Sequence, residues 1–280
     1  MVNDIAFHKL DIPYRGCLFH VSYFIRLGSD ETLLYLHGLG SSKSDFSGAS
    51  DIEALRHCTL VAFDWPGCGD TNYCEEINLG IDDLVEITSK LIASLGLDVS
   101  TIIGHSLGGL TGLLFAGKYE GRLRRFINIE GNLAPEDCFL SRDVAQYRFD
   151  EFVKDAFLDK LKQQLTQSPS KGVRIFADKF RGEVFDLAFW RYCSSIVDYS
   201  DHYDLIHRFA KLAIPKLFIY GSMNSHLSYL QILEREGIRI VEVPHSSHWP
   251  LYDNPSFVYQ TLAEFLSITT GCKKQDVNSN

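Results

Sequence analysis

Short, almost wholly apolar runs alternate along this chain with longer segments whose apolar residues recur at helical spacing. The short runs are residues 32–38, 59–64, 100–104, 125–131, 216–221 and 238–244. They are too short for helices and too uniformly apolar for strands with one exposed face, so we predict parallel strands buried on both faces. The segments with helical spacing are residues 81–95, 107–119, 228–236 and 256–266. This alternation predicts an α/β fold with a mostly parallel sheet and helices on both of its faces.

Two regions depart from this alternation. Residues 20–27 alternate between apolar and polar side chains, which is typical of an antiparallel edge strand. No strand pattern occurs between Gly131 and Pro215, where residues 148–165 carry one apolar face and predict a single amphipathic helix. We therefore predict a core of residues 1–131 and 211–267, an inserted helical lid of residues 132–210, and a disordered tail of residues 268–280.

Composition and charge narrow the class of protein. The 280 residues are 45% hydrophobic, which is enough for one large core, and the net charge of −9 gives an acidic surface that repels nucleic-acid phosphates. The N-terminal residues lack a basic segment followed by an apolar run, and no apolar stretch is long enough to cross a bilayer. We therefore expect no nucleic-acid partner and no membrane span, and the sequence leaves the oligomeric state open.

Cysteine and histidine usage adds two further expectations. The seven cysteines are scattered, odd in number and without a C-x-x-C pair. Such usage favours free thiols in a reducing compartment, and hence a cytoplasmic protein. The histidines lack the spacing of metal ligands, so we expect neither a metal site nor a cofactor.

The first candidate for chemistry is G-H-S-L-G-G at residues 104–109, between a predicted buried strand and an apolar helix. The pattern Gly104-x-Ser106-x-Gly108 in this context is typical of a nucleophile elbow, a turn so sharp that only small residues fit beside the serine. The serine hydroxyl is thereby held above a helix N-terminus. Ser106 is therefore our candidate nucleophile, and a phosphate-binding or purely structural turn is the alternative.

Two further motifs can serve this serine. In H-G-L-G at residues 37–40, the N–H of Leu39 can point at a developing oxyanion, with the N–H of Leu107 as second donor. The loop H-S-S-H-W-P after the last predicted strand can supply a general base. We predict His248 for that role, with His245 as the alternative. We expect His37 to be a structural hydrogen-bonding residue.

The order of H-G-L-G, D-W-P-G-C-G-D (64–70), G-H-S-L-G-G and S-S-H-W-P resembles the α/β-hydrolase family with a helical cap. The resemblance covers about residues 20–266 and implies that fold with serine chemistry, but no particular substrate. It also implies a catalytic acid after the strand that ends at Gly221. This chain departs from the family there, because Asn224 occupies the region and no Asp or Glu occurs between Gly221 and Leu233. An amide can orient an imidazole, but it cannot stabilise an imidazolium by charge.

A substitute acid is available at the end of the preceding predicted strand, in I-N-I-E-G-N (127–132). Parallel strands end at the same edge of a sheet, so the Glu130 carboxylate is expected beside the same cleft. Some family members, including certain haloalkane dehalogenases, similarly carry the triad acid at this strand end. We therefore predict that Glu130 replaces the missing acid. The alternatives are a dyad without an acid or one of three lid carboxylates, Asp198, Asp201 and Asp204.

A serine nucleophile implies acyl transfer by a covalent route. Family members that cleave carbon–halogen or epoxide bonds use an aspartate at the elbow, so Ser106 argues against both reactions. We predict a serine hydrolase that cleaves a carboxylic ester of a small-to-medium apolar substrate, with lid aromatics available as pocket walls. The alternatives are a carbon–carbon hydrolase acting on a diketone and a ligand-binding sensor with weak turnover.

Overall fold

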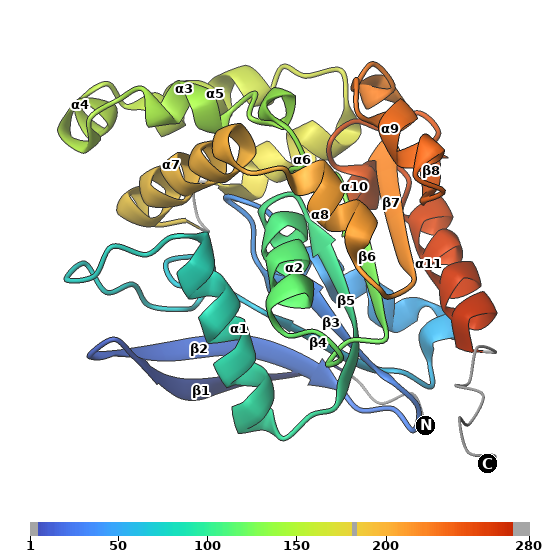
Figure 1. The fold of residues 1–280 in the computed structure, drawn as a ribbon. Helices are drawn as coiled ribbons and strands as arrows, with labels where there is room; N and C mark the ends of the chain where they lie inside the picture. Colours follow the sequence, from blue (N-terminus) through green and yellow to red (C-terminus); the bar gives the residue numbers. More distant parts are fainter. Residues whose placement is uncertain (1–4, 181–183, 271–280) are drawn as a thin grey trace, which may run out of the picture.

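The computed structural model describes residues 5–180 and 184–270, and an eight-stranded sheet forms its centre (Figure 1). The strand order is β1-β2-β4-β3-β5-β6-β7-β8. Strands β3 to β8 pair in parallel, whereas β2 pairs antiparallel with both β1 and β4. The strands are β1 (Ala6–Tyr14), β2 (Cys17–Arg26), β3 (Thr32–Leu36), β4 (Thr59–Phe63), β5 (Val99–His105), β6 (Arg125–Ile129), β7 (Lys216–Gly221) and β8 (Arg239–Val243). The α/β class and the mostly parallel sheet are therefore confirmed.

The prediction of an edge strand at residues 20–27 was wrong in one respect. This segment is antiparallel, but it belongs to β2, which is covered on its outer side by β1. Most side chains of β1 are exposed, so no buried run marks this strand in the sequence. The edge of the sheet is therefore β1.

Helices cover both faces of the sheet, as predicted. One face packs on α1 (Ile81–Leu95) and α2 (Leu107–Lys118), and the other packs on α11 (Pro255–Thr270). Alternate residues of β3 show this division. Leu34 and Leu36 join the cluster with α1 and α2, whereas Leu33 and Tyr35 join the cluster with α11. Each central strand is therefore buried on both sides, which explains its uniformly apolar sequence.

The chain between β6 and β7 is helical in its described part, with one isolated bridge from Val184 to Cys68. In Figure 1, α3 to α7 lie together along one end of the sheet. Phe152 and Phe176 of these helices belong to one hydrophobic cluster, which also includes Trp249 from the segment after β8. The helices are α3 (Ser141–Ala145), α4 (Phe149–Lys154), α5 (Phe157–Leu165), α6 (Lys171–Phe180), α7 (Asp186–His202) and α8 (Leu205–Lys211); α9 (Leu230–Arg235) and α10 (Pro250–Asp253) follow β7 and β8.

Two expectations about helices need correction. The single helix predicted over residues 148–165 is broken into α4 and α5 at Ala156, whose φ of 49° is left-handed. The break lets the rings of Phe152 and Phe157 pack with centroids 5.6 Å apart. At the C-terminal end, α11 continues to Thr270, so residues 268–270 are helical rather than part of a disordered tail. Residues 271–280 lie outside the described residues.

The expectation of free thiols fails for one pair of cysteines. Cys17 at the start of β2 and Cys74 in the loop before α1 form a disulfide across a sequence separation of 57 residues. Cys58, Cys138 and Cys193 are buried free thiols. None of the helices in the described ranges combines the length and the apolar character needed to traverse a bilayer.

Candidate active site

Ser106 lies between β5 and α2 in a strained turn. Its φ of 53° and ψ of −118° are unusual for a residue with a side chain. The neighbouring glycines explain how the turn fits. A methyl group at Gly108 would overlap the Leu36 carbonyl, and one at Gly104 would overlap the Gly108 carbonyl. The motif therefore brings β5, α2 and the end of β3 closer together than any residue with a side chain at these glycines would permit.

The H-G-L-G loop packs directly against this turn. A Cβ atom at Gly38 would lie 2.9 Å from His105 Nδ1 and 3.3 Å from Ser106 Cβ, so glycine is needed for the close approach. Leu39 and Ser106 line the same small cavity. Leu107 is the first residue of α2, and the first N–H groups of a helix have no partner within it. The N–H groups of Leu39 and Leu107 are thus the candidate donors to an oxyanion beside Ser106.

His248 and Glu130 are brought together from segments 118 residues apart. Glu130 Oε2 lies 3.3 Å from His248 Nδ1, and the two side chains are 3% and 13% exposed. A hydrogen bond at Nδ1 leaves Nε2 of the ring free to serve the hydroxyl of Ser106, which lines the same cavity as His248. The structure therefore brings the carboxylate of Glu130 to Nδ1 of His248.

Asn224 is a partner of Glu130 in the structure. Its side-chain amide donates to Glu130 Oε2 at 2.9 Å, and the N–H of Gly221 donates to Oε1 at 2.5 Å. The carboxylate thus accepts one hydrogen bond from each of three groups, Gly221, Asn224 and His248. These bonds fix its orientation.

The alternative acids and the alternative base lie elsewhere. Asp198 contacts His202, Asp201 contacts Arg142, and Asp204 contacts His207, each at 3.0 Å or less. His245 is exposed. Within the described residues, these contacts pair each of the three aspartates with a partner on the helices between β6 and β7.

Two other histidines support the site as neutral groups. His37 accepts a hydrogen bond from the backbone N–H of Trp65 through Nε2 and donates from Nδ1 to Gly38 O, and burial lowers its pKa. His105 Nε2 lies 2.8 Å from the carbonyl oxygen of His248, so this nitrogen carries the proton. Burial, together with the nearby His248, lowers the pKa of His105 to about 3. His105 therefore anchors the backbone of the histidine loop without carrying a charge.

The loop that carries His248 is also held by Asp253. Asp253 Oδ2 accepts from Ser247 Oγ at 2.7 Å, and Asp253 Oδ1 accepts from the N–H of Gly172 at 2.6 Å. Ser170 Oγ lies 2.9 Å from Ser247 Oγ and 3.0 Å from Asp253 Oδ1. The sequence offers one weak sign of this network. Many members of the family that the motifs resemble have glycine before the histidine, whereas Ser247 supplies a hydroxyl that binds Asp253.

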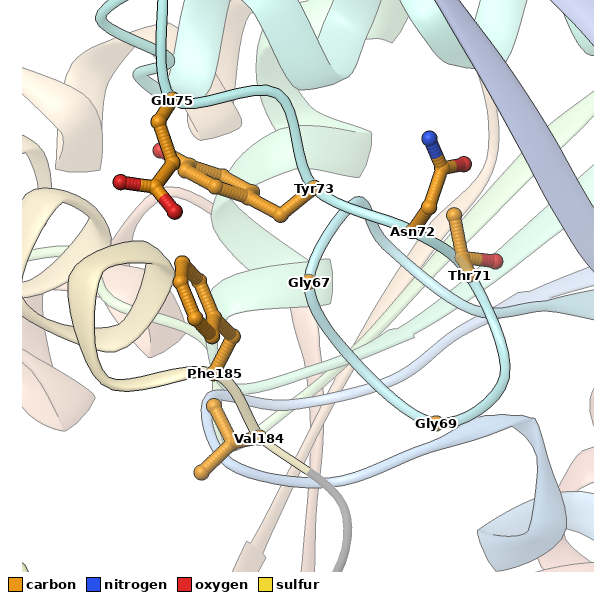
Figure 2. A pocket seen from close by; sticks show the side chains of 8 residues that line it. All are labelled: Gly67, Gly69, Thr71, Asn72, Tyr73, Glu75, Val184 and Phe185. Carbon is orange, nitrogen blue, oxygen red and sulfur yellow. The ribbon is translucent and has the colours of Figure 1, made fainter.

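Two cavities meet at His248. The inner cavity has a volume of about 30 Å³, and Ser106 and Leu39 are in its wall. The outer cavity has a volume of about 390 Å³, and Glu130 and Asn224 are in its wall. A further cavity of about 420 Å³ is lined by Tyr73, Phe185 and their neighbours, and shares no lining residue with either of these (Figure 2). The reacting groups therefore belong to the inner and outer cavities.

Among the described residues, one group of side chains has metal-ligand spacing: Cys17, Cys74 and Glu76. The two sulfur atoms of this group are bonded to each other as a disulfide, so they are not thiolate ligands. The group shares no residue with the cavities at His248.

Residues 33–261 match the family described as "Alpha/beta hydrolase family". This chain belongs to the alpha/beta hydrolase family. The family resemblance of its motifs is thereby confirmed, and the sheet agrees with the fold of solved relatives. A carboxylesterase of the thaumarchaeon Nitrososphaera gargenis matches this alpha/beta hydrolase with a TM-score of 0.77 and 17% identity, over 94% of this chain and 99% of that one.

Two named relatives align with very different lengths of this chain. An sn-1-specific diacylglycerol lipase of Mus musculus is 24% identical over 263 residues, which cover 86% of this chain and 83% of that protein. A 2-hydroxy-6-oxo-2,4-heptadienoate hydrolase of Pseudomonas putida is 27% identical over 103 residues, which cover 36% of this chain and 37% of that protein. Esterase-like and lipase-like relatives support ester hydrolysis as the general reaction of this alpha/beta hydrolase.

Proposed function

We propose that this alpha/beta hydrolase cleaves a carboxylic ester of a small-to-medium apolar substrate through an acyl-enzyme formed on Ser106. The serine hydroxyl attacks the carbonyl, and His248 takes its proton and returns it to the leaving alcohol. The N–H groups of Leu39 and Leu107 stabilise the oxyanion. Water then attacks the acyl group by the same route and releases the acid.

The contact of Glu130 with Nδ1 of His248 is the observation that carries this proposal. A carboxylate at Nδ1 selects the tautomer that leaves Nε2 ready to accept the serine proton, and it stabilises the imidazolium that forms. The 3.3 Å distance, together with the hydrogen bonds from Asn224 and Gly221, supports Glu130 in this role. In this proposal Asn224 orients Glu130, which takes the role of the acid that is absent at position 224.

We further propose that residues 132–210 act as a lid on a core formed by residues 1–131 and 211–267. Phe139, Phe176 and Ile196 come from this segment and line the inner cavity together with Ser106, which supports the assignment. A cytoplasmic location stays a prediction. The Cys17–Cys74 disulfide weighs against the reducing compartment on which that prediction was based.

A carbon–carbon hydrolase acting on a diketone is the second candidate. The partial match to the 2-hydroxy-6-oxo-2,4-heptadienoate hydrolase favours it, over the 103 residues that align. The two reactions would use the same serine, base and oxyanion donors, so the product distinguishes them.

The test is the hydrolysis of p-nitrophenyl acetate and of a vinylogous 1,5-diketone by the wild type, with Ser106→Ala as the blank. We expect the wild type to exceed the blank on the ester by at least about a thousandfold in kcat/KM. Cleavage of the diketone alone would replace the ester assignment with the second candidate. Wild-type rates equal to the blank on both substrates would contradict both candidates and favour a binding protein.

A further inference from the structure

The two cavities at His248 differ greatly in size and in the reacting groups that line them. Ser106 and Leu39 line only the inner cavity of about 30 Å³. Glu130 and Asn224 line only the outer cavity of about 390 Å³. His248 lines both cavities and thus stands at the boundary between them.

The chemistry of acyl transfer decides which part of an ester each cavity takes. The acyl carbon becomes bonded to Ser106 Oγ, and its oxygen must lie at the N–H of Leu39, so the acyl group belongs to the inner cavity. The alcohol oxygen leaves with the proton carried by His248. The leaving alcohol therefore lies on the histidine side, where the outer cavity offers the larger volume.

The walls of the inner cavity limit its size. Phe176 and Ile196 are each 2% exposed and belong to packed hydrophobic clusters, where close packing opposes displacement. A volume of about 30 Å³ has room for roughly one or two water-sized groups. Met223, which lines only the outer cavity, is 53% exposed, so this part of the outer wall is open to solvent.

We propose that this hydrolase is selective for esters of short acyl groups, acetyl or propionyl, on larger apolar alcohols. The inference rests on the proposed function. The short acyl group joins Ser106 Oγ as its bond to the alcohol oxygen breaks, and the alcohol leaves with the proton from His248. Water then releases the short carboxylic acid and restores the serine hydroxyl. Leu140, which is half-buried and lines only the inner cavity, is a residue that determines acyl length.

The experiment compares kcat/KM for p-nitrophenyl acetate and octanoate in the wild type, Leu140→Ala and Met223→Ala. We expect the wild type to prefer acetate by at least about tenfold, because the inner cavity cannot enclose the longer chain. Leu140→Ala enlarges that cavity and is expected to reduce the preference to about threefold or less. Met223→Ala is the matched control, because Met223 is exposed and lines only the outer cavity. It is expected to keep the wild-type acyl preference.

Equal wild-type rates on octanoate and acetate would overturn the inference, as would an equal shift of the acyl preference in both variants. A binding measurement separates this failure from a failure of the proposed function. Ethylboronic and octylboronic acid add reversibly to a serine oxygen without turnover, and Ser106→Ala again serves as the blank. Tighter binding of ethylboronic acid in a protein that hydrolyses neither ester would contradict the proposed function and support the short inner cavity. Tighter binding of octylboronic acid would contradict the short inner cavity.

Discussion

At the scale of single residues, the site depends on a sharp turn at the end of β6. Glu130 has a φ of 52°, a conformation that costs energy in a residue with a side chain. The next residue, Gly131, donates its N–H to Asn128 Oδ1 at 2.8 Å, and a methyl group at Gly131 would overlap that same oxygen. The turn directs Glu130 toward Gly221 and Asn224 at the end of β7. The sequence could predict this meeting because parallel strands end at a common edge.

Asp137 is a second carboxylate at this site, and no motif of the sequence pointed to it. It lines both cavities and accepts hydrogen bonds from the N–H groups of Leu133 and Ala134 and from the hydroxyl of Tyr229. Burial raises the pKa of Asp137 to about 6 in spite of these bonds. A proton on Asp137 is therefore held more tightly in the folded state than in the unfolded chain.

This pKa predicts how stability varies with pH. The stabilising contribution of Asp137 is full below the unfolded pKa of about 4 and is lost as the pH rises through about 6. Asp137→Asn lacks this dependence. We expect the free energy of unfolding of the wild type, relative to Asp137→Asn, to fall by about 1 kcal/mol between pH 5 and pH 7.5. Urea unfolding of both proteins at the two pH values measures the difference, and parallel curves would contradict the prediction.

At the scale of elements, the pattern of apolar residues predicted the buried parallel strands β3 to β7 and the helices between them. It also predicted β8, but as a strand buried on both faces, whereas only Val243 of β8 is fully buried. It missed β1, because an exposed strand has no buried run to mark it. It also joined α4 and α5 into one helix, because the apolar face continues through Ala156 while the backbone does not. Apolar periodicity indicates which side chains are buried, but it does not indicate a single residue whose backbone conformation ends a helix.

Asp253 connects two elements that are far apart in the sequence, the start of α6 and the loop of His248. Burial opposes its ionisation, but hydrogen bonds from Ser247, Gly172 and Ser170 outweigh burial and lower the pKa of Asp253. The carboxylate is therefore charged at neutral pH. It fixes Ser247, the residue before His248, against the helical segment between β6 and β7.

We expect Asp253→Ala to lower the free energy of unfolding by about 2–3 kcal/mol, because partly buried donors lose a charged acceptor. We also expect kcat to fall by about tenfold, since the histidine loop loses its support. Thermal unfolding and ester hydrolysis measure the two effects. Asp143→Ala on the exposed surface of α3 is the matched control. Equal behaviour of the two variants would count against the role of Asp253.

At the scale of the whole molecule, the sequence predicted contacts that follow from topology and missed contacts that do not. Ser106, Glu130 and the histidine loop meet because β5, β6 and β8 are parallel. The Cys17–Cys74 disulfide joins the β1–β2 hairpin to the loop before α1, and no sequence spacing indicates that meeting. The sequence also did not predict the boundary between the two cavities, because side chains from many segments form it.

The disulfide is expected to stabilise the fold by restricting the unfolded chain. A loop closed over 57 residues gives a stabilisation of about 2–4 kcal/mol. We therefore expect the double variant Cys17→Ser, Cys74→Ser to unfold at lower urea concentration than the wild type, and the wild type to approach it under reducing conditions. Alkylation and mass measurement before reduction give the number of free thiols. Alkylation of Cys17 and Cys74 in the unreduced, unfolded protein would contradict the pairing.

The central claim is that Glu130 is the acid that serves His248. The most direct measurement is kcat/KM of Glu130→Gln on p-nitrophenyl acetate, relative to the wild type and to the Ser106→Ala blank. Gln keeps the size of the side chain and removes its charge, and circular dichroism checks the fold. The double variant Glu130→Gln, Asn224→Asp returns a carboxylate to the family position and is expected to recover part of the activity. We predict a loss of about a hundredfold or more for Glu130→Gln. A variant that keeps wild-type kcat/KM would contradict the claim.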